Sequence, residues 1–141
     1  MARQKPIDPK DACVLIVEDN LQNLLLISRL LDQLGVRRYE WKSSGWEIME
    51  IAESMPQVDL VLLDLNLPLE DGYEVLTKLR DGPHFADARI VAVTGDADDA
   101  SMQRAKAAGF DGFLGKPIVV KKFPTQITDI LAGEPVWDLG Y

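Results

Sequence analysis

The stretch "DLVLLDLNLPLEDG", residues 59–72, places an acid at the end of an apolar run. Leu60, Val61, Leu62 and Leu63 form a pattern typical of a strand that is buried on both faces of a parallel sheet. Asp64 then interrupts the run, although burying a lone carboxylate costs free energy. The role of this acid therefore depends on which other residues reach the same place in the fold.

Four other stretches have strand character, and amphipathic segments separate them. Short apolar runs predict strands at 12–17, 89–94 and 110–114, and the more polar residues 37–42 predict an edge strand. A helix is expected after each strand, because apolar residues then recur three and four positions apart. The last of these helices is expected to start late and to carry Pro124 in its first turn.

The alternation of five strands with five helices predicts the α/β fold class. We expect a flavodoxin-like, doubly wound (βα)5 domain with a five-stranded parallel sheet, strand order 2-1-3-4-5, and helices on both faces. Residues 12–132 are expected to form this domain, after a lead-in at 1–11. Residues 133–141 show no clear periodicity and are expected to be a tail.

Composition and charge exclude several classes of protein. The 141 residues are 47% hydrophobic and 27% charged, which is typical of one globular domain. A net charge of −8 disfavours binding to nucleic acid. No run is apolar enough for a membrane span or a signal peptide, so we expect a cytoplasmic protein. Cys13 is the single cysteine, which excludes an internal disulfide.

Polar residues collect where the predicted strands end. Glu18 and Asp19 follow the first strand, Asp64 ends the third, Thr94 ends the fourth, and Lys116 follows the fifth. In open α/β sheets ligands bind beyond the carboxyl ends of the strands, so we expect these residues on one rim. The second strand, at the far edge, is expected to supply nothing comparable.

The residue types on this rim favour phosphoryl chemistry beside a metal ion. Three carboxylates in one pocket repel one another, by roughly 3 kcal/mol for each close pair at an effective dielectric constant near 20. A divalent cation relieves this repulsion, and all-oxygen ligands favour Mg²⁺ or Mn²⁺ over Zn²⁺. Asp64 is then predicted to act as the nucleophile, while Lys116 and Thr94 hold the phosphoryl oxygens.

Four segments give the chain a resemblance to the receiver domains of two-component response regulators. They are VLIVEDN at 14–20, LVLLDLNLPLEDG at 60–72, IVAVTGDAD at 90–98 and AGFDGFLGKP at 108–117. Each segment is weakly specific, but their joint order and spacing are highly specific. The resemblance covers residues 13–131, which is nearly the whole chain.

The resemblance implies a role for each residue of the rim. Asp64 would be the phosphoacceptor, with Asp19 ligating Mg²⁺ directly, Glu18 through water, and Asn66 through its backbone carbonyl. Thr94 would be the switch hydroxyl and Lys116 the phosphate-binding lysine. Phe113 would be the switch aromatic ring, and the peptide bond before Pro117 would be cis.

As a receiver, the protein is expected to be a phosphorylation-activated signalling switch that catalyses only its own phosphorylation and dephosphorylation. The partners implied are a sensor histidine kinase or histidine phosphotransfer protein, which donates from a phosphohistidine, and a downstream protein target. A homodimer is a further option. No effector domain follows the tail, so a stand-alone receiver is expected. Output is expected through the fourth helix, the fifth strand and the fifth helix, around Phe113.

The same residues have other, less specific interpretations. Glu18, Asp19 and Asn20 could simply begin a helix, where acids and Asn are favoured. A phosphatase with an aspartyl-phosphate intermediate is one alternative function, but Asn66 occupies the place of the second acid that it needs. An interaction module that acts without phosphorylation is another, and the complete set of rim residues disfavours it. The sequence leaves open the cognate kinase, the target and the lifetime of the phosphoryl group.

Overall fold

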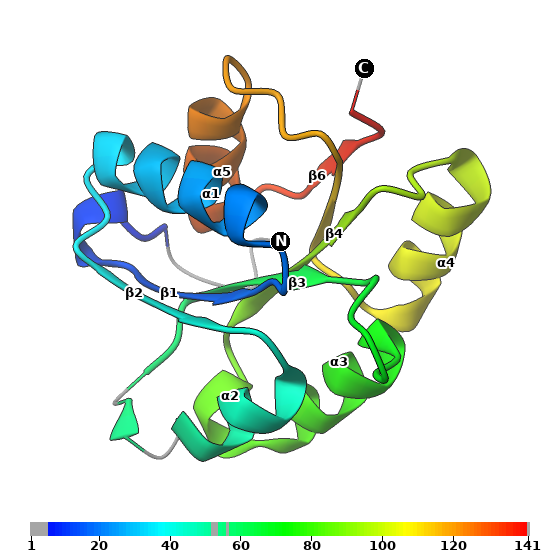
Figure 1. The fold of residues 1–141 in the computed structure, drawn as a ribbon. Coiled ribbons are helices and arrows are strands. Elements are labelled where there is room, and N and C mark those ends of the chain that lie inside the picture. The colour runs from blue at the N-terminus through cyan, green and yellow to red at the C-terminus, as the bar shows by residue number, and fades with distance from the viewer. Residues whose placement is uncertain (1–5, 52–53, 56, 141) are drawn as a thin grey trace.

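A parallel sheet of six strands lies at the centre of the computed structural model, which describes residues 6–51, 54–55 and 57–140. Helices cover both faces of the sheet (Figure 1). The strand order is β2-β1-β3-β4-β5-β6. This order confirms the doubly wound parallel sheet and the predicted order of its first five strands. The prediction of five strands is wrong, because a sixth strand follows the last helix.

The helices and strands alternate along the chain. The strands are β1 (Cys13–Val17), β2 (Arg38–Lys42), β3 (Leu60–Asp64), β4 (Arg89–Thr94), β5 (Gly112–Gly115) and β6 (Val136–Asp138). The helices are α1 (Leu21–Leu34), α2 (Gly45–Ile51), α3 (Gly72–Asp81), α4 (Asp99–Ala108) and α5 (Phe123–Leu131). The short 3-10 helices η1 (Pro9–Asp11) and η3 (Pro83–Phe85) precede β1 and β4.

Two hydrophobic cores lie on opposite faces of the sheet, because successive residues of a strand point to opposite sides. Leu15 and Val17 of β1 pack with side chains from α2, α3 and α4. Val14 and Ile16 pack on the other face with α1 and α5. All residues of β1, β3 and β4 are buried. This burial on both faces explains why these strands are continuous apolar runs in the sequence.

Local sequence signals set the ends of the helices. The Asn20 side chain caps α1, and Gly35 ends that helix in the left-handed region, at a φ of 98°. Asp98 caps α4 in the same way as Asn20 caps α1. The late start of α5 is confirmed, with Pro124 in its first turn. No helix among the described residues is both long and apolar enough to cross a membrane.

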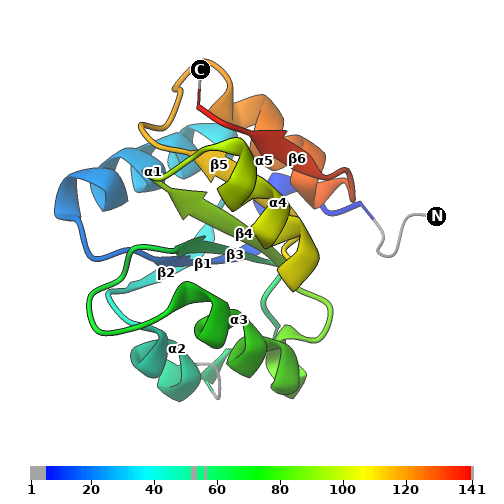
Figure 2. The same cartoon turned by 90° about the vertical axis from the view of Figure 1, so that its right-hand side faces the viewer.

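The sixth strand is formed by residues that the sequence analysis assigned to a tail. β6 pairs in parallel with β5, with Trp137 opposite Phe113, and Figure 2 faces this edge of the sheet. The absence of side chains at Gly112 and Gly115 permits the close approach, since a Cβ on Gly115 would overlap the carbonyl oxygen of Leu139. The segment is too short for a period-two pattern, so only pairing with β5 defines it as a strand.

Candidate functional site

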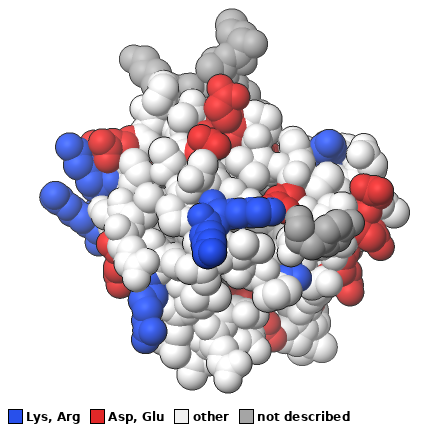
Figure 3. Space-filling model, turned by 90° about the horizontal axis from the view of Figure 1, so that it is seen from above, with Lys and Arg blue, Asp and Glu red and all other residues white. Residues whose placement is uncertain are grey.

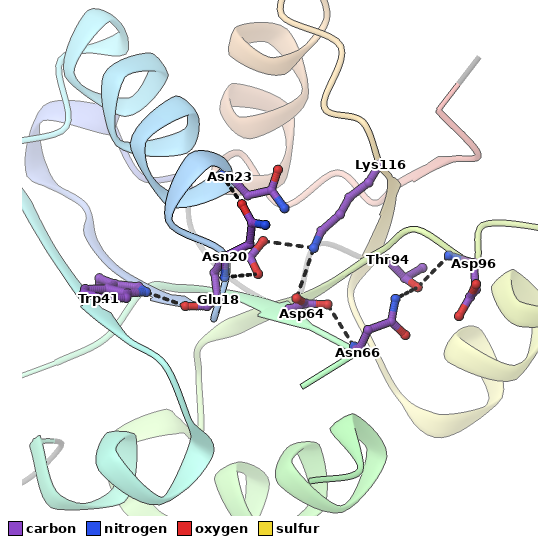
Figure 4. A network of polar contacts seen from close by, with 9 residues as sticks. All are labelled: Glu18, Asn20, Asn23, Trp41, Asp64, Asn66, Thr94, Asp96 and Lys116. Atoms are coloured by element: carbon purple, nitrogen blue, oxygen red, sulfur yellow. Dashed lines mark hydrogen bonds and ion pairs between the residues drawn. The ribbon is translucent and has the colours of Figure 1, made fainter. Parts of the chain in front are cut away.

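The carboxyl ends of four strands bring the predicted polar residues onto one rim of the sheet (Figure 4). Glu18 follows β1, Asp64 ends β3 and Thr94 ends β4, and these side chains are 2%, 3% and 1% exposed. Asp19 is exposed to solvent. Lys116 follows β5 and reaches back toward the acids from the neighbouring loop. A buried carboxylate, an acidic pair, a hydroxyl and an ammonium group therefore lie together.

Lys116 links two of the three acids. Its Nζ lies 2.9 Å from Oε1 of Glu18 and 3.0 Å from Oδ2 of Asp64. Burial opposes the charge of Lys116, but the contacts with Glu18 and Asp64 outweigh burial and raise the pKa of the lysine above its usual value. The ammonium group therefore stays charged and neutralises part of the acidic cluster.

Glu18 holds its proton unusually tightly. Burial is the main cause, the adjacent Asp64 carboxylate adds to it, and Lys116 partly offsets both, so that the pKa of Glu18 is raised to about 7. Its Oε2 accepts a hydrogen bond from the backbone N–H of Asn20 at 3.3 Å. Its Oε1, although paired with the Lys116 ammonium, accepts no hydrogen bond of good geometry from any described residue. Negative charge is therefore in excess at this end of the pocket.

The acidic residues fit a hard divalent cation. Glu18, Asp19 and Asp64 each offer a carboxylate oxygen, and these three atoms lie within 4.8 Å of one another. Such all-oxygen donor sets suit Mg²⁺, which prefers oxygen ligands and keeps several waters. The single ammonium group of Lys116 contacts Glu18 and Asp64, and no ion pair shown for the described residues involves Asp19, so a cation would relieve the repulsion that remains among the three carboxylates.

Asn66 ties the phosphoacceptor candidate to the hydroxyl candidate. Its backbone N–H donates to Oδ1 of Asp64 at 2.8 Å, and its side-chain Nδ2 donates to Oγ1 of Thr94 at 3.3 Å. The Thr94 hydroxyl also accepts from the backbone N–H of Asp96 at 3.0 Å. These contacts hold the Thr94 hydroxyl between the β3–α3 loop, which contains Asn66, and the β4–α4 loop, which contains Asp96.

The resemblance also assigns roles to Phe113, which precedes Lys116 in the sequence, and to Pro117, which follows it. Phe113 is fully buried and belongs to the core beneath α2, α3 and α4. The Lys116–Pro117 peptide bond is cis. The role of Phe113 as a switch stays a prediction.

One residue at the rim was missed by the sequence analysis, which assigned nothing to the end of the second strand. Trp41 of β2 donates a hydrogen bond from its indole Nε1 to the backbone carbonyl of Glu18. Trp41 is 38% exposed, although it is a large aromatic residue. An aromatic residue in an otherwise polar edge strand was the available signal, but only the β1–β2 register places it against Glu18.

The fold and the rim together define a class: a doubly wound α/β protein with a buried aspartate beside an acidic pair and a lysine. The family model of the response regulator receiver domain matches residues 14–128. The chain belongs to this family, which confirms the resemblance seen in the sequence.

Similar proteins include both short proteins and large kinases. The chain is 34% identical over 114 residues to "Probable chemotaxis protein CheY" of Rhizobium etli, covering 81% of this chain and 88% of that protein. It is 34% identical over 119 residues to the polar-differentiation response regulator DivK of Brucella ovis, covering 84% and 94%. It is 35% identical over 105 residues to the signal transduction histidine-protein kinase BarA of Escherichia coli, covering 74% of this chain but 11% of the kinase.

Solved structures share the same fold. The receiver domain of sensor histidine kinase PA1611 from Pseudomonas aeruginosa, described with a magnesium ion coordinated in its active site cleft, matches with a TM-score of 0.73 and 28% identity, over 87% of this chain and 98% of that one. Chemotaxis protein CheY4 of Vibrio cholerae matches with a TM-score of 0.76 and 24% identity, over 84% and 98%. The second likeness concerns the fold alone.

Proposed function

We propose that this receiver is a phosphorylation-activated signalling switch in which Asp64 accepts a phosphoryl group from a partner's phosphohistidine. The observation that carries the proposal is the pairing of Lys116 Nζ with Asp64 Oδ2 at 3.0 Å, beside Glu18 and Asp19. A buried carboxylate that is matched to a fixed ammonium group and an acidic pair suits transfer of a phosphoryl group.

Four residues would hold Mg²⁺ in this proposal. They are Glu18, Asp19 and Asp64, through their carboxylates, and Asn66, through its backbone carbonyl. Support comes from the three carboxylate oxygens within 4.8 Å of one another and from the position of Asn66 next to Asp64. The cation, when bound, neutralises charge on the phosphoryl oxygens and on the acids.

The chain's own groups account for the transfer step. An Asp64 carboxylate oxygen attacks phosphorus, the phosphorus–nitrogen bond to the donor imidazole breaks, and an acyl phosphate forms on Asp64 while the imidazole takes up a proton. Lys116 turns its ammonium group from the carboxylates to a phosphoryl oxygen, and the Thr94 hydroxyl donates to another. Attack by water on phosphorus later returns Asp64 and releases inorganic phosphate.

A surface for the phosphodonor partner lies beside the acids. Leu21 and Leu25 on the first turns of α1 are 61% and 54% exposed, next to the Glu18–Asp19 pair. Large exposed aliphatic residues next to a reactive group favour docking of an apolar protein surface. On the side of the molecule that Figure 3 views, Lys, Arg, Asp and Glu occur in small separate groups on a surface formed largely by other residues.

The face that the sequence predicts for output, formed by the fourth helix, the fifth strand and the fifth helix, also carries β6. β6 covers the outer edge of β5, so the exposed face is formed by α4, β6 and α5. We propose that phosphorylation at Asp64 draws the Thr94 hydroxyl toward the phosphoryl group and shifts α4, which changes this face for a downstream target or a second copy of the chain.

Phosphorylation by a small phosphodonor tests the proposal. With phosphoramidate and Mg²⁺, intact mass spectrometry should show the addition of one phosphoryl group to the parent and none to Asp64→Asn. The matched control is Asp71→Asn in the same β3–α3 loop, because Asp71 is exposed and Asn preserves its capping role. The control should be phosphorylated like the parent.

Two outcomes would contradict the proposal. Phosphorylation of Asp64→Asn at the parental rate would place the nucleophile at another residue. Sustained turnover of generic phosphoesters by the parent would instead identify a phosphatase.

Phosphotransfer from purified sensor kinases or phosphotransfer proteins then identifies the donor partner.

A further inference from the structure

Two hydrogen bonds with the end of β2 hold the backbone of Glu18, the first residue of the acidic pair. The backbone N–H of Glu18 donates to the carbonyl of Lys42 at 3.1 Å. On the other side of the same residue, the indole Nε1–H of Trp41 donates to the carbonyl of Glu18. Figure 4 shows the indole lying on the far side of Glu18 from Asp64 and Lys116. Glu18 is therefore fixed to the edge strand through both of its peptide groups.

The contact with Trp41 bears directly on Asp19. The carbonyl of Glu18 and the N–H of Asp19 belong to one planar peptide unit, so a hydrogen bond that fixes the carbonyl also fixes the direction in which the chain enters Asp19. No hydrogen bond or ion pair shown for the described residues involves the Asp19 side chain, which is exposed to solvent. The backbone therefore sets the direction of its Cα–Cβ bond, and the side chain chooses among staggered rotamers from that starting point.

Repulsion makes such fixing necessary. The carboxylate of Asp19 lies close to those of Glu18 and Asp64, and Lys116 contacts only the latter two. An exposed carboxylate in this position lowers its free energy by turning away into water. A backbone held in one orientation keeps the Cα–Cβ bond of Asp19 directed toward the site, so that a staggered rotamer facing a cation stays accessible.

We propose that Trp41 is a positioning residue for the cation site, acting through its hydrogen bond to the Glu18 carbonyl to hold Asp19 in place as a ligand. The inference rests on the proposed function, because it concerns the Mg²⁺ that the proposed phosphoryl transfer uses. It assigns a role to β2, the edge strand that contributes no ligand of its own. Removing the hydrogen bond should lower the affinity for Mg²⁺ without removing a ligand.

The alternative role for Trp41 is packing, and the chain offers a matched control for it. Trp46 lies five residues away at the start of α2, is 70% exposed, and has the Lys78 ammonium 4.9 Å from its ring centroid. Its indole makes no hydrogen bond that the structure shows for the described residues. Trp46→Phe therefore removes a nearby exposed indole without altering the acidic pair.

The test measures Mg²⁺ affinity by calorimetry and thermal stability without Mg²⁺ in the same variants. Trp41→Phe removes both the donor and part of the ring. Replacing Trp41 by benzothienylalanine, in which sulfur takes the place of the indole N–H, keeps the shape and removes only the donor. Both changes should weaken Mg²⁺ binding about 3- to 10-fold, which corresponds to the net contribution of one hydrogen bond. Trp46→Phe should bind Mg²⁺ like the parent.

A second readout concerns Asp19 itself. The backbone amide of Asp19 should exchange with solvent faster in the benzothienylalanine variant than in the parent, while amides in the interior of α1 keep their rates. The melting temperature without Mg²⁺ should stay close to the parental value in that variant, because ring packing is retained. This combination separates positioning of the ligand from a general loss of stability.

The outcomes separate the inference from the proposed function. If the parent binds Mg²⁺ and the benzothienylalanine variant binds it equally well, Trp41 does not position the site and the inference is overturned. The inference is also overturned if Trp41→Phe loses Mg²⁺ affinity and thermal stability together, while the benzothienylalanine variant keeps the parental values of both. If the parent binds no Mg²⁺, the metal part of the proposed function fails, and the inference fails with it.

Discussion

The two sides of Asp64 are held in place in different ways. The acidic side, comprising Glu18, Asp19, α1 and β2, is tied down by a well-buried helix and by backbone contacts. The hydroxyl side, comprising Thr94, α4, β5 and β6, is covered by a helix, α4, that buries fewer and smaller side chains than α1 does. The difference indicates which side can change shape when charge is added at Asp64: movement costs less on the hydroxyl side.

The buried faces of α1 and α4 show the difference most directly. α1 buries Leu24, Ile27, Leu30 and Leu31 against the sheet and α5. α4 buries only Met102 and Ala105 among its residues. Since stabilisation scales with the apolar area removed from water, α4 contributes less packing energy to its position than α1.

Contacts at the sides of α4 add modestly to its few anchors. The Arg104 guanidinium lies 4.0 Å from the ring centroid of Tyr73 on α3. The Lys106 ammonium lies 5.0 Å from the ring centroid of Trp137 on β6. Cation–π contacts at partly exposed positions are each worth about 0.5–1 kcal/mol, so they restrain α4 without locking it.

The largest expected effect comes from truncating a core side chain on each helix. Ile27→Ala should lower the free energy of unfolding by about 3–4 kcal/mol, because Ile27 is 1% exposed. Met102→Ala should lower it by about 2 kcal/mol, because Met102 is 7% exposed and lies on a helix with few buried side chains. Urea unfolding of both variants measures the two losses. Equal losses, or a larger loss for Met102→Ala, would contradict the inference that α4 is held by less packing energy than α1.

The second effect is electrostatic and belongs to the acidic side. Because the pKa of Glu18 is raised to about 7 from a reference of 4.5, the folded protein binds a proton more tightly than the unfolded chain does. Without metal, stability should therefore fall as pH rises from about 4.5 to about 7, by at most about 3 kcal/mol, and then level off.

Unfolding experiments in a chelating buffer at several pH values test this dependence, with Glu18→Gln as the variant that should lose most of it. The lowered pKa of Asp138 acts below this window and does not interfere. A parent protein whose stability is constant between pH 4.5 and 7 would show that the acidic side carries no electrostatic strain.

The third prediction concerns the close approach of β6 to the hydroxyl side. Gly115→Ala would place a Cβ against the Leu139 carbonyl and 2.8 Å from the Ala97 side chain. The substitution should cost about 2 kcal/mol, as overpacked sites do. Gly95→Ala is the control, since its Cβ would meet only Asn66 at 4.0 Å, and it should change stability by less than about 0.5 kcal/mol. Similar losses of stability for both variants would show that β6 can move away from Gly115 at little cost in free energy.

The smallest expected effect comes from removing the cation–π contacts at the sides of α4. Arg104→Gln and Lys106→Gln should each lower stability by about 0.5–1 kcal/mol and speed amide exchange within α4. Arg29→Gln, an exposed arginine on α1 with no ring contact shown for the described residues, is the control and should leave exchange in α1 unchanged. If neither change affects α4, its position depends on the buried residues alone.

Much of the fold follows from local patterns that need no knowledge of the rest of the chain. The apolar runs of β1, β3 and β4 are strands because both faces of a central parallel strand are buried. Gly35 and Asp98 mark helix ends through their own conformational and hydrogen-bonding preferences. The gathering of Glu18, Asp64 and Lys116 follows from the rule that parallel strands present their carboxyl ends at one rim.

Two features depended on contacts between distant parts of the chain. β6 is a strand only because the glycines of β5 allow its backbone to approach and pair, and three residues carry no periodic signal of their own. Trp41 reaches the Glu18 carbonyl because the β1–β2 register places it opposite Ile16, next to the end of β1. The central strands and the reactive residues could be predicted from local patterns, because burial on both faces and the common direction of the strands leave a clear trace in the sequence. The sixth strand and the hydrogen bond from Trp41 that supports Glu18 could not be predicted in this way, since strand register and the close approach of two backbones depend on residues far apart in the chain.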